Sequence, residues 1–395
     1  MRVGFVVQRY GLEVCGGAEL LCRQVAEHMA AHWEVEVFTS CAQDYSTWEN
    51  VCRPGTDELN GIPVHRYRVT EHRVGNEYER LSNKVFHAAH TDDEEKRWMR
   101  LVGPWVPDLP AALAEAKDSF DCFIFFTYLY VTTYYGLPVV KEKAFFLPTA
   151  HNEPPLRLRL FDKIFNAPKG FIYLSPEERA LVHRRFRNAH IPGHVIGAGI
   201  EHSGAADGSR FRKKHGIHGP FMLYVGRIDQ AKNCDQLFRY FQLSRDELAS
   251  GHQLLLMGQA FMSVPEGAGI RHLGFVPDED KFDALAAADL LVLPSTQESL
   301  SIVLLEAWSV GTPVLVNGDC DVLVGQCRRA QGGLWYHGRE QFVEAVQYLV
   351  SNPDVRERMG RNGRQYVDAN YRWDTIERKF LEFTASTLSQ PAASA

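Results

Sequence analysis

Short, continuous apolar runs recur along the chain, and such runs are typical of strands buried on both faces of a parallel sheet. The first run covers 3–7, and a loop then leads to a segment at 21–29 whose apolar residues recur at helical spacing. A second run at 35–38 completes a strand–loop–helix–strand unit. This unit is the building block of a doubly wound α/β sheet.

The same alternation continues through two halves of similar size. In the first half we expect further strands at 122–126, 144–147, 171–174 and 194–197, and Ser175-Pro176 predicts a helix start. In the second half we expect strands at 221–225, 253–257, 272–276, 290–293 and 313–316, and helices near 232–244, 279–287, 300–310, 339–350 and 353–369. Residues 41–118 show a helix start near 91–98 and an Asn60-Gly61 turn, but no further interpretable pattern.

The pattern therefore predicts an α/β protein of two Rossmann-like, doubly wound domains. The first covers 1–198. The second covers 199–371 and begins with a linker poor in large apolar residues. Two such domains usually bind their ligand in a cleft between the carboxyl ends of their sheets.

Composition and charge narrow the classes of function. The 395 residues are 45% hydrophobic and 23% charged, and their formal net charge is −6. This balance excludes a mainly disordered chain and argues against nucleic acid as the main partner. No apolar run approaches the roughly 18 residues that span a bilayer, and the first run is too short for a signal peptide. We expect a cytoplasmic protein.

The cysteines argue against a disulfide framework or a metal site. The chain has eight, none in a C-x-x-C pair or in a Cys/His cluster with zinc spacing. We therefore expect reduced and mostly buried thiols.

Two glutamates separated by seven residues are the most informative pattern. Glu298 and Glu306 follow the strand predicted at 290–293. If the turn opens a helix, they lie up to roughly 12 Å apart along its axis, and the helix N-terminus between them suits a phosphate. Glu306 also stands in an apolar run, where a carboxylate needs hydrogen-bond donors such as ribose hydroxyls.

Cations occupy the loop expected after the first strand of the second half. Gly226 and Arg227 follow 221–225, and Lys232 comes five positions later. Arginine offers a planar fork and lysine a point charge for phosphate oxygens. This loop therefore predicts a diphosphate site.

Two loops of the first half add weaker signals. Gly16-Gly17 stands between the first strand and the first helix, where glycine lets the backbone approach a ligand. The G-x-G-x-x-G dinucleotide fingerprint is absent. His151 directly follows a predicted strand, at the edge that faces the expected cleft.

These four features together resemble the retaining glycosyltransferases of family 4, which have the GT-B fold. The resemblance covers nearly the whole chain, and it implies that a last helix at 372–388 crosses back to the first domain. The implied activity is a metal-independent, retaining transfer of a sugar from a nucleotide-diphosphate sugar to a glycan or lipid-linked acceptor, as in polysaccharide biosynthesis. No cofactor or metal is implied beyond the nucleotide sugar as co-substrate.

The resemblance also assigns roles to residues. Arg227 and Lys232 would neutralise the donor diphosphate, Glu298 would contact the donor sugar, and Glu306 would bind the ribose. His151 would lie near the reacting sugar, which makes Arg227, Lys232, Glu298 and His151 the catalytic candidates. The remaining donor-binding candidates are Gly16, Gly17, Gly226, Phe275, Val276, Ser299, Leu300 and Ser301, with Phe275 and Val276 as the nucleobase wall.

Some features depart from the family pattern or leave alternatives open. Family members often have Phe-Gly where this chain has Leu300-Ser301, which predicts a tighter sugar pocket or another donor preference. Asp319-Cys320-Asp321 matches a D-x-D metal motif, but it follows a strand of the Rossmann series, and we reject that interpretation. A nucleotide-sugar epimerase on the same scaffold and a non-catalytic sugar-nucleotide-binding protein remain alternatives. The nucleobase, the sugar, the acceptor and the oligomeric state cannot be predicted from these patterns.

Two basic clusters have two interpretations. His183-Arg184-Arg185-Phe186-Arg187 and Arg212-Lys213-Lys214 are either solvated helix faces or contacts to an anionic membrane surface that carries a lipid-linked acceptor. The second interpretation places the protein at the inner face of the membrane.

Overall fold

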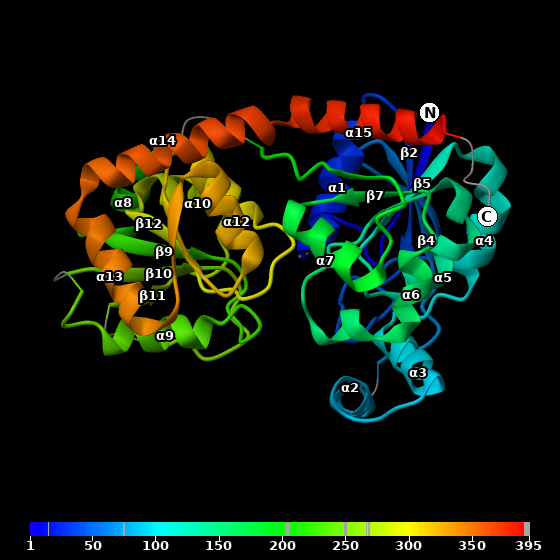
Figure 1. Ribbon diagram of the computed structural model, residues 1–395, viewed down its shortest axis with the longest axis horizontal. Coiled ribbons are helices and arrows are strands. Elements are labelled where there is room, and N and C mark those ends of the chain that lie inside the picture. Colours follow the sequence, from blue (N-terminus) through cyan, green and yellow to red (C-terminus); the bar gives the residue numbers. More distant parts are fainter. Residues whose placement is uncertain are drawn as a thin grey trace. The chain divides into compact units, whose positions relative to one another are not determined.

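The computed structural model describes residues 1–14, 16–73, 76–201, 206–248, 251–265, 267 and 269–390. Cys15 and part of the predicted linker, 202–205, lie outside the described residues. The chain divides into two compact units (Figure 1). The first is Met1–Ala198 with the residues from Ile376 onward, and the second is Gly199–Thr375.

The first unit contains a sheet of eight strands among the described residues, in the order β3-β4-β2-β1-β5-β6-β7-β8. All neighbours pair in parallel except β3 and β4. The strands are β1 (Arg2–Val6), β2 (Glu34–Ser40), β3 (Gly55–Leu59), β4 (Ile62–Tyr67), β5 (Cys122–Phe126), β6 (Ala144–Leu147), β7 (Gly170–Tyr173) and β8 (Gly193–Val195). Strands β5, β6 and β7 are buried along their full length, which is why they appear in the sequence as continuous apolar runs.

Helices and short 3₁₀ turns connect these strands. They are α1 (Gly17–Met29), α2 (Glu77–His87), α3 (Asp92–Val102), α4 (Asp108–Ala116), η1 (Lys117–Ser119), α5 (Val131–Gly136), η2 (Leu137–Val139), η3 (Lys141–Lys143), η4 (Pro154–Arg157), η5 (Arg159–Phe161), α6 (Asp162–Phe165) and α7 (Pro176–Phe186). Ser175 caps α7 as predicted, because its side chain accepts a hydrogen bond from the Glu178 N–H. Thr91 and Glu94 form a capping box at the start of α3.

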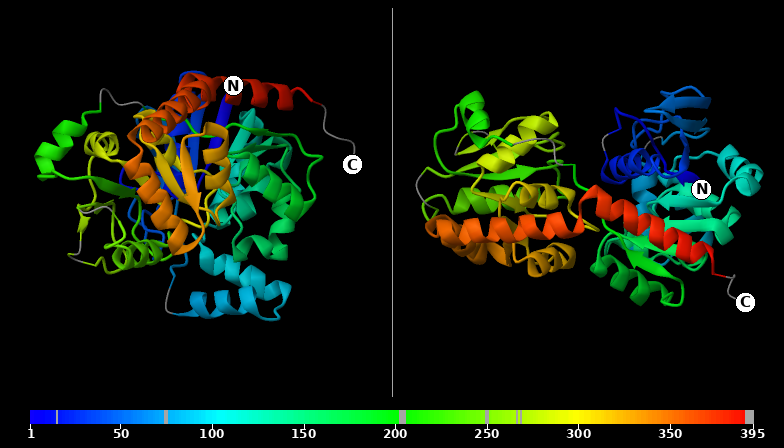
Figure 2. Two further views of the ribbon diagram at one scale, coloured as in Figure 1. Left: turned by 60° about the vertical axis from the view of Figure 1, so that its left-hand side comes forward. Right: turned by 90° about the horizontal axis from the view of Figure 1, so that it is seen from above.

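The second unit has a parallel sheet of six strands among the described residues, in the order β11-β10-β9-β12-β13-β14. Helices pack against this sheet (Figure 2). Its strands are β9 (Phe221–Val225), β10 (Gln253–Met257), β11 (Ile270–His272), β12 (Leu290–Leu293), β13 (Val314–Asn317) and β14 (Gly333–Tyr336). Its helices are α8 (Gly208–His215), α9 (Cys234–Leu243), α10 (Asp278–Ala287), α11 (Ile302–Ser309), α12 (Asp321–Ala330), α13 (Gly338–Ser351) and α14 (Pro353–Asn370). The two sheets confirm the predicted pair of doubly wound α/β folds.

The last helix, α15 (Trp373–Leu388), starts in the second unit and continues into the first. Within the first unit, the Glu377 carboxylate contacts His28 and His32 of the α1 region, each at 2.9 Å. Phe383 packs edge-on against Phe145 of β6 at 5.8 Å. No helix among the described residues is long and apolar enough to cross a membrane.

Candidate active site

Sheet topology brings the predicted cationic loop and the first glutamate together in the second unit. The order β11-β10-β9-β12-β13-β14 reverses between β9 and β12. In such a sheet, ligands bind outside the carboxyl ends of the strands at the point of reversal. The loop after β9 carries Arg227 and Lys232, and the loop after β12 carries Glu298. Both loops therefore leave the sheet at the position expected of a ligand site.

Asp229 organises the loop after β9. Its carboxylate accepts a hydrogen bond from the Lys232 N–H at 2.8 Å and lies 3.3 Å from the Arg227 guanidinium. The Tyr224 hydroxyl donates to the Arg227 carbonyl at 2.5 Å, and burial raises the pKa of that hydroxyl. Gly226 has φ +146°, a conformation that L side chains rarely adopt. The role of Asp229 cannot be recognised in the sequence, because a lone aspartate in a loop has no distinctive spacing.

The Glu298 loop is fixed to the same edge. The Pro294 carbonyl, at the end of β12, accepts hydrogen bonds from the Asn233 and Asn317 side chains at 3.1 and 2.9 Å. The Lys232 ammonium reaches the Glu298 carboxylate at 2.7 Å, and both side chains are partly exposed. A group predicted to bind phosphate and a group predicted to bind sugar thus form one accessible ion pair.

Helix α11 begins later than the sequence suggested. Ser301 is its N-cap, so Glu298 lies in the preceding loop and not on the first helical turn. Leu300 and Ser301 are buried and Ser299 is partly buried. The first N–H groups of a helix lack acceptors within the helix, so the start of α11 keeps the donors expected to face a diphosphate.

Glu306 has a partner that the sequence did not reveal. Its carboxylate contacts the Lys281 ammonium of α10 at 2.7 Å, and Lys281 also lies 2.9 Å from Asp278. Burial acts to lower the pKa of Lys281, but the two carboxylates more than offset this and raise it. The ion pair occupies one carboxylate oxygen of Glu306 and holds the side chain in place.

The predicted nucleobase wall lies in a loop. The strand expected at 272–276 is in fact β11 at Ile270–His272, so Phe275 and Val276 follow it. The Phe275 side chain is 78% exposed, and Val276 is partly buried. The prediction placed the strand too far along because the apolar residues that follow Leu273 belong to the loop.

The other predicted residues belong to the first unit. Gly16 is the N-cap of α1, and a Cβ there would overlap the Glu19 carboxylate, which is paired with Arg9. His151 follows β6 and lies 3.6 Å from Glu153, which accepts a hydrogen bond from the Tyr128 hydroxyl at 2.6 Å. The imidazole is partly buried and stays accessible.

A buried carboxylate that sequence analysis missed supports the His151 loop. Glu178 of α7 accepts hydrogen bonds from the Ala150 N–H at 2.6 Å and from the Leu174 N–H at 2.7 Å. It therefore ties the ends of β6 and β7 together immediately before His151. Burial raises the pKa of Glu178 to about 8, although the backbone N–H groups act against this rise.

The D-x-D segment and the basic clusters are largely engaged within the protein. Asp319 contacts His337 at 3.0 Å, and α12 begins at Asp321. The described residues hold no cluster of three or more His, Cys, Asp or Glu side chains suited to a metal ion. Arg185 donates to the carbonyls of 156, 157 and 158, and Arg212 donates to those of 219 and 287. These two arginines thus serve the fold, whereas Arg184, Arg187 and Lys213 remain exposed.

Comparison with known proteins points to glycosyltransferases. Residues 207–366 match the family model described as "Glycosyl transferases group 1". An uncharacterised glycosyltransferase of Methanocaldococcus jannaschii is 23% identical over 96% of both chains. The lipopolysaccharide glucosyltransferase WaaG of Escherichia coli is 29% identical over 40% of this chain and 45% of its own.

Solved structures show the same architecture over the full length. Sucrose-phosphate synthase from Thermosynechococcus elongatus superposes with a TM-score of 0.72 and 17% identity, covering 98% of this chain and 99% of its own. Anabaena HepE in complex with UDP-glucose has a TM-score of 0.71 and 15% identity, covering 98% and 100%. These structures show that the chain has the GT-B fold. The match over residues 207–366, together with the full-length relative, identifies the second unit as a group 1 glycosyltransferase domain.

Proposed function

We propose that this enzyme transfers a sugar from a nucleotide-diphosphate donor to a glycan or lipid-linked acceptor, with retention of configuration and without a metal ion. The observation that carries the proposal is the Lys232–Glu298 ion pair, at 2.7 Å, in the two loops that flank the reversal point of the second sheet. One end of that pair suits a phosphate and the other suits sugar hydroxyls. The reaction would take place in the cytoplasm, and any membrane contact would be at the inner face. The seven cysteines that the structure describes are free thiols, as expected in that compartment.

The donor diphosphate would lie against the loop after β9. Its negative charge would attract the Arg227 guanidinium and the Lys232 ammonium, and Glu298 would then be released toward the sugar. Both cations would also stabilise the charge that develops on the leaving diphosphate in the transition state. Gly226 and residues 299–301 would contribute backbone donors, and Phe275 and Val276 would cover the base.

The comparisons suggest which donor to test first. HepE was solved with UDP-glucose, and WaaG is named as a glucosyltransferase. We therefore propose UDP-glucose as the first candidate donor. His151 would act near the reacting sugar, and Gly16 and Gly17 would let the backbone of the first unit approach the substrate.

Two glutamate variants test this two-ended donor site. Glu306→Gln should weaken UDP binding by about tenfold, because a charged hydrogen bond to the ribose is lost. Glu298→Gln should leave UDP binding within about twofold of wild type and should lower turnover of UDP-glucose instead. Titration calorimetry with UDP and a donor-consumption assay give the two measurements.

Asp278→Asn is the matched control, because it removes the other carboxylate beside Lys281 without touching Glu306. It should bind UDP as wild type does. Equal losses of UDP affinity in Glu298→Gln and Glu306→Gln would contradict the proposed donor site. Consumption of donor to an isomerised sugar nucleotide without any acceptor would favour the epimerase alternative.

A further inference from the structure

A cavity of about 380 Å³ opens in the first unit, and no role has yet been assigned to it. Residues of α3, α5, η2 and α6 line it: Lys96, Tyr134, Tyr135, Pro138, Val139 and Lys163. Ligand sites in proteins typically measure roughly 300–1,000 Å³. The cavity is therefore large enough for a small ligand or for one unit of a longer one.

Rigid aromatic rings form one wall. The Tyr134 and Tyr135 rings stand perpendicular to each other with centroids 4.9 Å apart, and Tyr135 also meets Trp105 edge-on at 5.3 Å. Such edge-to-face contacts hold the rings in place. Neither tyrosine hydroxyl has a hydrogen-bond partner in the described part of the chain. A fixed ring with an available hydroxyl suits a sugar, which presents both C–H faces and hydroxyl groups.

Two lysines supply positive charge from different elements. Lys163 of α6 is exposed and has no ion-pair partner among the residues that the structure describes. Lys96 of α3 contacts Asp93 at 3.0 Å, but both side chains are largely exposed and such a pair is weak. An anionic group in the cavity would therefore meet two available ammonium groups.

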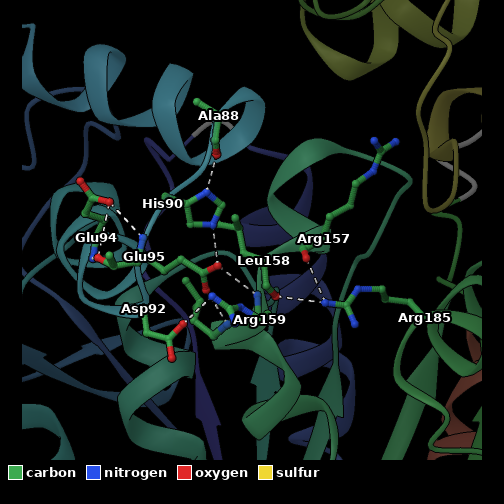
Figure 3. Close-up of polar contacts among 11 residues, drawn as sticks. Ala88, His90, Asp92, Glu94, Glu95, Arg157, Leu158, Arg159 and Arg185 are labelled. Carbon is green, nitrogen blue, oxygen red and sulfur yellow. Dashed lines mark hydrogen bonds and ion pairs between the residues drawn. The ribbon is translucent and has the colours of Figure 1, made fainter.

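A buried carboxylate holds the two lysine-bearing elements together (Figure 3). Glu95 directly precedes Lys96, and its carboxylate accepts hydrogen bonds from the Leu160 N–H at 2.7 Å and the Arg159 N–H at 3.3 Å. These residues belong to η5, which runs directly into α6 and Lys163. Glu95 thus fixes α3, which carries Lys96, to the segment η5–α6, which carries Lys163.

His90 lies beside the Glu95 carboxylate and contacts an acceptor with each ring nitrogen. One ring nitrogen lies 2.9 Å from the Ala88 carbonyl and the other lies 2.9 Å from Glu95 (Figure 3). When the imidazole is protonated, it can donate to both the carbonyl and the carboxylate. Hydrogen bonds to the Ala88 carbonyl and to Glu95 raise the pKa of His90.

We propose that this cavity is a subsite for an acidic sugar unit of the acceptor, one that carries a carboxylate or a phosphate. The tyrosine rings would contact the sugar ring, and Lys96 and Lys163 would bind the anionic group. This inference rests on the proposed glycosyltransferase function and names the chemical class of its acceptor. None of the six lining residues is among those assigned to the nucleotide sugar.

The test measures glycan binding in the absence of any donor. The full chain is titrated with a fluorescently labelled oligogalacturonate of six units and, separately, with neutral maltohexaose. We expect the acidic probe to bind at least about tenfold more tightly than the neutral one, because two charge-assisted contacts are added. The double variant Lys96→Gln/Lys163→Gln should lose this preference, and added salt should weaken the wild-type interaction.

A matched control separates this site from general charge effects. Lys213→Gln/Arg239→Gln removes two exposed positive charges of the second unit and should bind the acidic probe within about twofold of wild type. Four outcomes would overturn the proposal: no binding of the acidic probe, equal binding of both probes, an equal loss in the control, or displacement of the probe by phosphatidylglycerol vesicles through the same two lysines. Glycan binding without sugar transfer from any donor would contradict only the proposed function.

Discussion

Charged side chains in apolar surroundings need partners, and Glu306 and Glu178 meet this need in different ways. For Glu306, the apolar run around it correctly predicted a carboxylate in need of hydrogen-bond donors. The donor found in the structure is Lys281, 25 positions earlier on another helix. Local spacing cannot reveal such a pair, because it forms only when α10 packs beside α11. The ribose assignment of Glu306 remains a prediction, now with a residue that orients it.

Glu178 leads to a prediction on pH dependence. Its folded-state pKa is about 8, raised by burial from an ordinary value of 4.5. The folded state therefore keeps a proton that the unfolded chain releases between these values. The resulting stabilisation is complete below about pH 4.5 and is lost as pH rises toward 8, at no more than about 1.4 kcal/mol per pH unit.

Glu178→Gln should remove that dependence. The midpoint temperature of thermal unfolding of the wild type should decrease as the pH is raised from 6 to 8.5. The midpoint temperature of the variant should decrease less. The variant should also be less stable than wild type at pH 6, since an amide can accept only one of the two backbone N–H bonds now made. Parallel pH profiles for the two proteins would show that Glu178 does not titrate in this range.

At the scale of elements, the strands that were predicted correctly are those with a single strong signal. β5, β6, β9, β10 and β12 lie at the predicted residues because each is a buried, uninterrupted apolar run. β3 was missed because almost all of it is exposed and polar, and it pairs only at the sheet edge. β14 and α12 were missed for a related reason: Gly333 and the mixed pattern of 321–330 weaken the periodicity on which the prediction depends.

Packing of α14 onto α11 gives an element-scale prediction. Gly363 of α14 lies against the ring of Trp308, which is fully buried on α11 two residues after Glu306. A Cβ at Gly363 would overlap that ring, so Gly363→Ala must push the helices apart. We expect a loss of about 1–3 kcal/mol from overpacking, only partly offset by the better helix propensity of alanine, about 1 kcal/mol.

The comparison for this variant is Gln365→Ala, an exposed position in the same helix. It should change the unfolding midpoint little. Because α11 carries Glu306, Gly363→Ala should also weaken UDP binding, which titration calorimetry can measure. A Gly363→Ala protein as stable as wild type would mean that α14 adjusts without cost.

At the scale of the whole molecule, the alternation of strands and helices was enough to predict two doubly wound sheets, and the motifs in their loops indicated the family. The sheet order could not be predicted, since neighbouring strands in a sheet need not be neighbours in the chain. That order explains why the loops of Arg227, Lys232 and Glu298 leave the same edge: the strands that carry these loops, β9 and β12, are adjacent although residues 226–289 separate them in the chain. The roles of His151, Gly16 and Gly17 remain predictions.

Charge neutralisation by these side chains leads to a prediction on metals. If Arg227 and Lys232 balance the diphosphate, the enzyme should turn over its donor after exhaustive treatment with EDTA. Activity should stay within about twofold of the untreated enzyme and should not rise with added Mg²⁺ or Mn²⁺. Complete loss, restored by either ion, would show that the two cations are insufficient.

The stereochemistry of the product tests the whole assignment. Retention by double displacement needs a protein nucleophile that forms a glycosyl-enzyme, and Glu298, the glutamate assigned to the sugar, instead pairs with Lys232 at 2.7 Å. We therefore expect front-face substitution, in which the leaving diphosphate oxygen accepts the proton of the acceptor hydroxyl. Arg227 would act mainly on the charge of that leaving group, so Arg227→Ala should lower kcat as well as donor affinity. NMR of the anomeric proton of the product decides the main point: an inverted linkage would contradict both this mechanism and the retaining assignment.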